Sequence, residues 1–385
     1  MNDFVPLCEP SIQGNEWKYI KDCLDTNWVS SVGKYVDAFE NTIAEYLGVQ
    51  YAIATVNGTS ALHTALLVAG IKPNDEVLTS TLTFIAPANA IRYVGAWPIF
   101  IDAEMQYWQM DIDKLTDFIR NKCSWKNGNL INNLTHRKIT AILPVHVLGH
   151  PSNMKPIMNL AKKYNLKVIE DCTESLGSKY SDNMSGSFGD MSCFSFNGNK
   201  LITTGGGGMI TTNNQRFAEK AKHLTTQAKS HNIEYIHDEI GYNYRLTNIQ
   251  AAMGVAQMER INEYIECKQL IAKNYNTALE SNDAIITMKE APWAKSVWWM
   301  YTILINQKIS KIDSRSLLKS LDEVRIQTRP LWQPLHMSSA HSNSQATDCS
   351  KSELLYQQSL SLPCSVGLNT KDQDLVISKI ESYLI

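Results

Sequence analysis

The chain has no apolar run of the roughly 20 residues that a membrane span requires. Its opening residues, MNDFVP, carry neither a basic region nor an apolar core of the kind found in secretory signals. The 36 basic and 38 acidic side chains nearly cancel, and the net charge of −2 predicts no general affinity for nucleic acid or anionic membranes. We therefore expect a cytoplasmic protein whose partners are small molecules.

Cysteine and histidine are present but form no recognisable pattern. The eight cysteines include no C-x-x-C pair, and the nine histidines are scattered along the chain. This distribution favours buried free thiols in a reducing compartment over a disulfide framework. We expect no metal site.

Short β-favouring runs alternate with segments of helical periodicity over the first two thirds of the chain. The expected strands are Ala52–Val56, Glu76–Thr79, Pro98–Asp102, Thr140–Val145, Lys167–Glu170, Ser192–Phe196 and Met209–Thr212. The expected helices are Glu16–Asp25, Tyr35–Leu47, Thr59–Ala69, Asp111–Lys122, Lys155–Tyr164 and Gln215–Leu224. Such alternation indicates an α/β fold with a mostly parallel seven-stranded sheet.

The last third of the chain follows a different pattern. A long helical pattern covers 248–279 and leads to shorter elements, namely a strand at Met300–Ile305, a helix at Arg315–Leu321, an extended run at Arg325–Arg329 and a final amphipathic helix at Lys371–Ile385. We predict a large domain over 1–260 and a small α+β domain over 261–385. The first 15 residues or so are expected to pack on the small domain or on a partner subunit.

A lysine and an acid stand at the ends of two expected strands. Lys200 follows the apolar run at 193–196 and precedes four glycines, and a shielded lysine has a lowered pKa that allows Schiff-base chemistry. Asp171 ends the run that begins at Lys167, on the edge where open α/β sheets bind ligands. Together they suit pyridoxal phosphate (PLP), whose aldehyde bonds a lysine and whose ring nitrogen pairs with an acid. Either residue alone is more often a cap or a surface charge.

A third element strengthens this hypothesis. Gly58, Thr59 and Ser60 follow an expected strand and open an amphipathic helix. A glycine and two hydroxyl residues at a helix start offer N–H and O–H donors at the positive end of the helix dipole, which is a phosphate site. An ordinary N-cap by Asn57 or Thr59 is the alternative.

These motifs resemble those of the DegT-type sugar-nucleotide aminotransferases, which have the PLP-dependent fold type I. The resemblance extends from Pro10 to about His336 and includes Thr83-Phe84, Glu170-Asp171 and the segment 241–246. The resemblance implies Lys200 as the Schiff-base lysine and catalytic base, Asp171 on the ring nitrogen, Gly58, Thr59 and Ser195 on the phosphate, Phe84 on the ring face, and Asn243 reaching the phosphate from the neighbouring subunit of a homodimer.

Glu174 departs from many family members, which carry glutamine three residues after the pairing aspartate. A carboxylate beside the phenolic oxygen of PLP is repulsive unless one group is protonated, so the cofactor should titrate differently here. Glu174 and the asparagine-rich stretch 121–133 resemble the branch that acts on UDP-linked 4-keto-6-deoxy N-acetylhexosamines and feeds bacillosamine- and legionaminic-acid-type sugars. The implied reaction transfers the amino group of L-glutamate to the 4-keto carbon of such a sugar.

Four further residues are candidates for substrate binding. Ser30 lies in a stretch that resembles the family's N-terminal substrate loop, although it suits a helix cap equally. His146 follows an expected strand and contacts either the sugar or cofactor or, alternatively, a backbone carbonyl. Arg329 offers a forked donor for a carboxylate or pyrophosphate, or else stacks on Trp332 at the surface. His336 lies in the segment that resembles the small-domain edge of the site.

Two alternative functions share this fold. A PLP-dependent sugar dehydratase would replace the lysine with histidine, and Lys200 argues against that reading. A non-catalytic, sugar-responsive regulator would be expected to lose Lys200, Asp171 or the phosphate hydroxyls, all of which are present.

Overall fold

The computed structural model describes residues 4–231 and 233–384. A nine-stranded sheet forms its centre, and seven of these strands follow one continuous order. In that order they are β1 (Tyr51–Thr55), β11 (Gly208–Thr212), β10 (Met191–Ser195), β7 (Lys167–Asp171), β6 (Lys138–Leu143), β2 (Glu76–Ser80) and β3 (Trp97–Ile101). Strand β11 is antiparallel to both neighbours, and β10, β7, β6, β2 and β3 are parallel. The expected mostly parallel sheet is confirmed.

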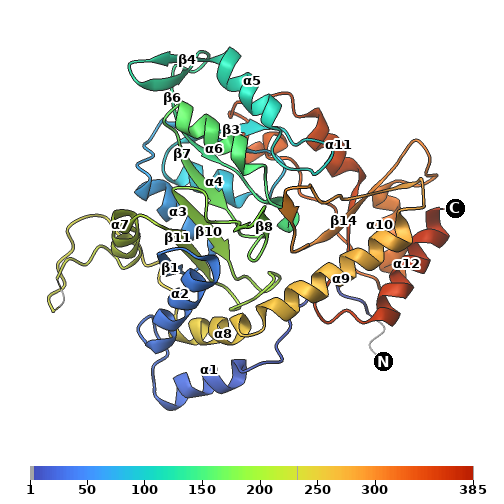
Figure 1. The fold of residues 1–385 in the computed structure, drawn as a ribbon, viewed down its shortest axis with the longest axis horizontal. Helices are drawn as coiled ribbons and strands as arrows, with labels where there is room; N and C mark the ends of the chain where they lie inside the picture. The colour runs from blue at the N-terminus through green and yellow to red at the C-terminus, as the bar shows by residue number, and fades with distance from the viewer. Residues whose placement is uncertain (1–3, 232, 385) are drawn as a thin grey trace.

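The asparagine-rich stretch 121–133 forms a β-hairpin, which lies at the top of Figure 1. Its strands are β4 (Cys123–Lys126) and β5 (Asn129–Asn132), and β5 pairs with the first residues of β6. The turn residues Asn127 and Gly128 have φ angles of 50° and 73°, as a two-residue type I′ turn requires. The hairpin therefore extends the sheet at the amino-terminal end of β6.

Helices cover both faces of this sheet. They are α1 (Glu16–Asp25), α2 (Lys34–Leu47), α3 (Gly58–Val68), α4 (Ala86–Tyr93), α5 (Ile112–Lys122), α6 (Met154–Lys163), α7 (Gln215–Thr225) and α8 (Asn248–Met258). Leu62 and Leu66 of α3 belong to the larger apolar core, whereas Phe118 of α5 and Ile157 of α6 belong to a second core. The six helices expected in this region are present to within one residue at each end, and α4 was not expected.

The long helical pattern over 248–279 is two helices, α8 and α9 (Ile261–Leu279). Helix α8 is held against α2 by Gly254, where a Cβ would lie 2.7 Å from the ring of Phe39. Helix α9 leaves in a new direction towards the C-terminal part, as the gold helix of Figure 1 shows. The break falls beside residue 260, where the sequence-based domain boundary is placed.

The C-terminal part contains a separate three-stranded antiparallel sheet. Its elements are β12 (Ile285–Thr287), β14 (Tyr301–Ile305) and β15 (Ser359–Leu362), with helices α10 (Ser314–Glu323), α11 (Ser350–Gln358) and α12 (Thr370–Leu384). Ile385, the last residue of the expected final helix, lies outside the described residues. Within the described ranges, no helix is long and apolar enough to cross a membrane.

The N-terminal segment lies against this C-terminal part of the same chain. Val5 pairs with Ile326, and the carbonyl of Leu7 accepts the N–H of Cys364 at 2.8 Å. A third small sheet, β13 (Ala294–Lys295), β8 (Lys179–Tyr180) and β9 (Asn183–Met184), joins the C-terminal part to the loops of the large sheet.

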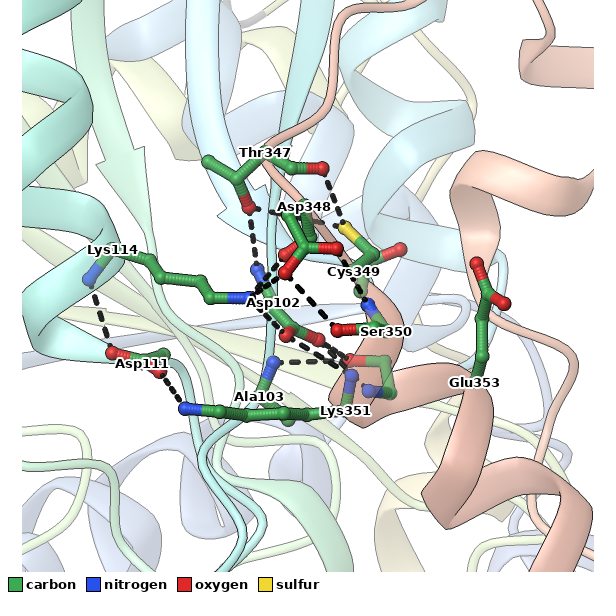
Figure 2. Close-up of polar contacts among 12 residues, drawn as sticks. Asp102, Ala103, Asp111, Lys114, Thr347, Asp348, Cys349, Ser350, Lys351 and Glu353 are labelled. Carbon is green, nitrogen blue, oxygen red and sulfur yellow. Dashed lines mark hydrogen bonds and ion pairs between the residues drawn. The ribbon is translucent and has the colours of Figure 1, made fainter.

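A polar cluster also ties the C-terminal part to the large sheet, as Figure 2 shows. The buried carboxylate of Asp102, just beyond β3, accepts the N–H of Ser352 at 2.8 Å and the ammonium of Lys114 at 2.7 Å. Lys114 also pairs with Asp348 at 2.9 Å. Helix α11 is thereby capped by an acid from the large sheet.

Candidate active site

A cavity of about 330 Å³ opens at the carboxyl ends of β7 and β10. This is the edge at which open α/β sheets bind ligands. Residues from both parts of the chain form its wall. Seven of the residues predicted for the site lie in that wall: Gly58, Thr59, Phe84, Asp171, Glu174, Ser195 and Lys200.

Lys200 reaches the cavity from the loop that follows β10. Only 14% of its side chain is exposed, and Nζ lies 3.9 Å from Oε1 of Glu174. Burial lowers the pKa of Lys200, while the carboxylates of Glu174 and Asp171 act in the opposite direction. Because the net shift is downward, Lys200 has a larger neutral, nucleophilic fraction than an exposed lysine.

Two carboxyl groups lie beside this amine. Asp171 ends β7, and its Oδ1 accepts the N–H of Thr173 at 3.0 Å; burial raises the pKa of Asp171. Oε2 of Glu174 accepts the N–H of Leu148 at 2.8 Å. Burial raises the pKa of Glu174 to about 7, against the charge of Lys200. Near neutral pH, Glu174 is therefore divided between its protonated and ionised forms.

The turn that donates to Glu174 has an uncommon backbone. It is the short 3₁₀ helix η1 (Val147–Gly149), in which Leu148 has φ 60° and ψ 15°, a left-handed conformation that residues with side chains rarely adopt. A Cβ on Gly149 would lie 2.7 Å from the backbone nitrogen of Trp299. The turn thus aims an N–H at Glu174 and lets the chain at Trp299 approach the cavity.

The first turn of α3 forms another side of the cavity. Oδ1 of Asn57 accepts the N–H of Ser60 at 2.8 Å and caps the helix. The N–H groups of Gly58 and Thr59 lie ahead of the first intrahelical donor, the N–H of Ala61, and both residues line the cavity. A Cβ on Gly58 would lie 2.9 Å from Cβ of Ser195, so the glycine permits this close approach. Ser60 is buried behind the wall.

This donor set fits PLP. The first turn of α3 suits a phosphate, because donors gather there at the positive end of a helix. Asp171 suits the ring nitrogen, and Lys200 suits the aldehyde. Phe84 stands in the wall with 55% of its surface exposed, as a side chain that covers a ring face requires.

Two tryptophans in the wall were not among the predicted site residues, and Trp332 was considered only beside Arg329. The rings of Trp299 and Trp332 are nearly parallel, with an interplanar angle of 5° and centroids 6.4 Å apart. Nε1 of Trp299 donates to the carbonyl of Asn199 at 2.7 Å. The paired Trp298-Trp299 before an expected strand was the available signal. Other wall residues that the prediction omitted are Asn57, Thr83, Ala86, Pro87, Thr173, Asn197, Asn199, Gly206 and Gly207.

The structure does not bring His146 to the cavity wall. Its buried ring lies with Nε2 3.1 Å from Oε2 of Glu170, and Nδ1 accepts the N–H of Ser152 at 2.9 Å. Glu170 points away from the cavity into the core, where a buried carboxylate needs partners, and His146 supplies one. The ring therefore contacts a carboxylate and a backbone N–H, and not the backbone carbonyl considered from the sequence.

Four other predicted residues lie outside this wall. Ser30, Asn243 and Arg329 are exposed, and Nη1 of Arg329 donates to a neighbouring backbone carbonyl at 2.9 Å. Nε2 of His336 lies 3.1 Å from Oε1 of Glu353 on α11. None of these four side chains shares the wall that holds Lys200.

The sequence matches known proteins over nearly its whole length. Residues 10–381 match the DegT/DnrJ/EryC1/StrS aminotransferase family. The chain is 38% identical to GDP-perosamine synthase of Caulobacter vibrioides, across 99% of this chain and 98% of that protein. It is 43% identical to GDP-perosamine synthase of Escherichia coli O157:H7, across 86% of each. It is 34% identical to the UDP-4-amino-4,6-dideoxy-N-acetyl-beta-L-altrosamine transaminase of Campylobacter jejuni, across 91% of this chain and 90% of that one.

A solved structure of the same family has the same fold. A crystal structure of a DegT DnrJ EryC1 StrS aminotransferase from Brucella abortus superimposes with a TM-score of 0.87 at 28% identity, and the match covers 96% of this chain and 95% of that chain. The expected aminotransferase fold of type I is thereby confirmed. The chain belongs to the DegT/DnrJ/EryC1/StrS family and is a PLP-dependent sugar aminotransferase.

Proposed function

We propose that this enzyme transfers an amino group from L-glutamate to the C4 keto carbon of a nucleotide-linked 4-keto-6-deoxy sugar. The observation that carries the proposal is a single cavity that combines a shielded amine on Lys200, the carboxyl groups of Asp171 and Glu174, and the first turn of α3. The names of the relatives, perosamine synthases and a 4-amino-4,6-dideoxy sugar transaminase, support C4 as the position of amination.

PLP, when bound, supplies an electron sink for the charge left when a proton leaves the α carbon of the amino donor. The cofactor would be held at its aldehyde by Lys200, at its ring nitrogen by Asp171, at its ring face by Phe84, and at its phosphate by Gly58, Thr59 and Ser195. Each of these residues lies in the wall of the same cavity.

The protein's own part in the reaction centres on one nitrogen. In its neutral form, Nζ of Lys200 takes the proton from the donor and holds it until delivery. Glu174, 3.9 Å away, stabilises the resulting ammonium when it is ionised. The ring of Trp299 faces the same nitrogen and keeps water from it.

Two nucleotide-linked keto sugars are candidate substrates of this enzyme. The GDP-perosamine synthases favour a GDP-linked 4-keto-6-deoxyhexose. Glu174 and the resemblance of the hairpin favour the UDP-linked N-acetylhexosamine expected from the sequence. Among the described residues, however, the hairpin β4–β5 contributes none to the cavity wall, because it joins β6 at the opposite end. We place the GDP-linked sugar first and the UDP-linked sugar second.

We also propose a homodimer in which Asn243 completes the phosphate site of the partner. Asn243 is exposed and lies outside the cavity of its own chain. The same segment, between α7 and α8, carries the exposed apolar side chains Ile233, Tyr235 and Ile240. This segment extends away from the sheet at the left of Figure 1. Exposed apolar groups of this kind favour an interface.

The test supplies PLP, ¹⁵N-labelled L-glutamate and either keto sugar to the purified enzyme. We expect 2-oxoglutarate and a ¹⁵N-labelled amino sugar, formed faster from the GDP-linked substrate. Lys200→Ala should form no product, and the exposed Lys72→Ala should react normally. Faster reaction of the UDP-linked sugar would reverse our order of candidates. Loss of water without incorporation of label would identify a dehydratase and refute the proposal.

A further inference from the structure

Two cysteines and a lysine from distant segments meet behind the wall of the cavity. Lys268 of α9 is buried, and its Nζ lies 3.5 Å from Sγ of Cys364 and 3.9 Å from Sγ of Cys8. The side chains of Cys8 and Cys364 thus share Nζ of Lys268 as a partner. The remaining partners of Nζ are the carbonyls of Trp299 at 2.8 Å and Cys364 at 2.5 Å.

This ammonium has no ordinary counter-ion. Among the described residues, no carboxylate lies within ion-pair distance of Lys268. A buried charge is costly unless it is paired, so the thiolate of Cys364 is the natural anion at this position. The adjacent thiol of Cys8 and the charge of Lys268 lower the pKa of Cys364 to about 6, despite burial. The same contact raises the pKa of Cys8, so one thiolate and one thiol lie together.

The pair adjoins the loop that carries Lys200. Sγ of Cys8 donates to the carbonyl of Asn199 at 3.4 Å, and the same carbonyl accepts Nε1 of Trp299. Cys8 is half-buried and Cys364 is buried, so a small molecule approaches the pair from the side of Cys8. The backbone segments that carry the two thiols are already hydrogen-bonded, since the N–H of Cys364 donates to Leu7.

We propose that Cys8 and Cys364 form a reversible disulfide on exposure to hydroperoxides, and that this bond slows the enzyme. The thiolate of Cys364 attacks one oxygen of hydrogen peroxide, the O–O bond breaks, and hydroxide leaves. The resulting sulfenic acid is then attacked by the sulfur of Cys8, and an S–S bond forms as water leaves with the proton of Cys8. The two sulfurs are oxidised by two electrons in total, one peroxide oxygen leaves as hydroxide and the other leaves as water.

Oxidation changes two contacts that reach the active site. It removes the anion that balances Lys268, whose Nζ also holds the carbonyl of Trp299. It also removes the hydrogen that Cys8 donates to Asn199, the residue before Lys200. Small displacements near a reacting nitrogen are costly, and we expect a fall of about tenfold or more in kcat.

The experiment treats the PLP-loaded enzyme with hydrogen peroxide and maps its peptides without reduction. We expect a cross-linked pair of peptides that contain residues 8 and 364, lighter by two hydrogens than their sum, together with the loss of activity. Dithiothreitol should restore both. Cys8→Ser should abolish the cross-link and protect the rate. Cys267 is a half-buried cysteine next to Lys268, and the control variant Cys267→Ser should behave as the wild type.

Three results would overturn this inference: oxygen retained on either cysteine or in a bridge to Lys268, a cross-link with no change in rate, or equal inactivation of Cys8→Ser. The peptide map requires no sugar substrate, so its outcome is independent of the proposed function.

Discussion

The ring centre of Trp299 lies 3.9 Å from Nζ of Lys200. The indole N–H of the same side chain donates to Asn199, one residue before the lysine, at 2.7 Å. Trp299 therefore holds both the amine and the backbone of Lys200. The tryptophan precedes β14 of the C-terminal part and the lysine follows β10 of the large sheet, so this contact couples the two parts at the reacting nitrogen.

Removal of the indole should slow catalysis. A desolvated contact between a cation and an aromatic ring contributes up to about 2 kcal/mol, so we expect Trp299→Leu to lower kcat roughly 10- to 30-fold. Trp299→Phe keeps a ring and should lose less. Steady-state kinetics with L-glutamate and the keto sugar measures both, and Trp125→Leu on the hairpin is the matched control. Equal losses in Trp299→Leu and Trp299→Phe would show that the hydrogen bond to Asn199 matters and the ring does not, because both variants lose the indole N–H.

Glu174 should make the stability of the cofactor-free protein depend on pH. Its folded pKa of about 7 exceeds the ordinary value of 4.5, so the folded state binds the proton more tightly. This contribution is complete below the ordinary value and is lost as pH rises through about 7; its upper limit is roughly 3 kcal/mol. Urea unfolding at about pH 5 and about pH 8 should show a decline in the wild type that is smaller in Glu174→Gln.

The exposed Glu45→Gln should retain the full decline in the same experiment. If the free energy of unfolding declined equally in the wild type and in Glu174→Gln, the group that binds the proton would not be Glu174.

Subunits should complement one another across the proposed dimer. Lys200→Ala and Asn243→Ala should each be strongly impaired alone. In a mixed dimer, one site would combine Lys200 of the second variant with Asn243 of the first, and activity should return to as much as a quarter of the wild-type value, roughly the share expected from random pairing. Activity assays on mixtures that are unfolded and refolded together provide the measurement. Mixtures no more active than their components would contradict a shared site.

Asp102 should contribute more to stability than any surface acid. Asp102→Ala leaves Lys114 and the N–H of Ser352 without their buried acceptor, and loss of one partner from a buried pair costs about 3–5 kcal/mol. Asp102→Asn keeps an acceptor for α11 and should cost less. Urea denaturation gives both values, with the exposed Asp374→Asn as control. A loss below about 1 kcal/mol for Asp102→Ala would mean that the cluster in Figure 2 is dispensable.

Local chemistry explains which parts of this protein could be read from the sequence. The β-favouring runs marked all seven central strands, and Asn57 with Gly58 marked the start of α3. Lys200 and Asp171 could be placed from their positions relative to marked strands. Asp171 ends one strand and Lys200 lies beyond the end of another, and the ends of parallel strands meet at one edge of a sheet. No long-range information was needed for either residue.

The sequence alone therefore determined the alternating architecture, the cofactor class and the residues that stand at strand ends. Tertiary structure decided the rest: that Trp299 covers Lys200 and bonds Asn199 from a segment 100 residues beyond Asn199, that His146 turns inward to Glu170, and that Cys8, Lys268 and Cys364 share one buried position. Strand ends follow from local pattern and register, whereas these contacts depend on how α9 and the C-terminal sheet pack on the large sheet. Packing of that kind is set by the balance of many distant contacts, and no local stretch of sequence records it.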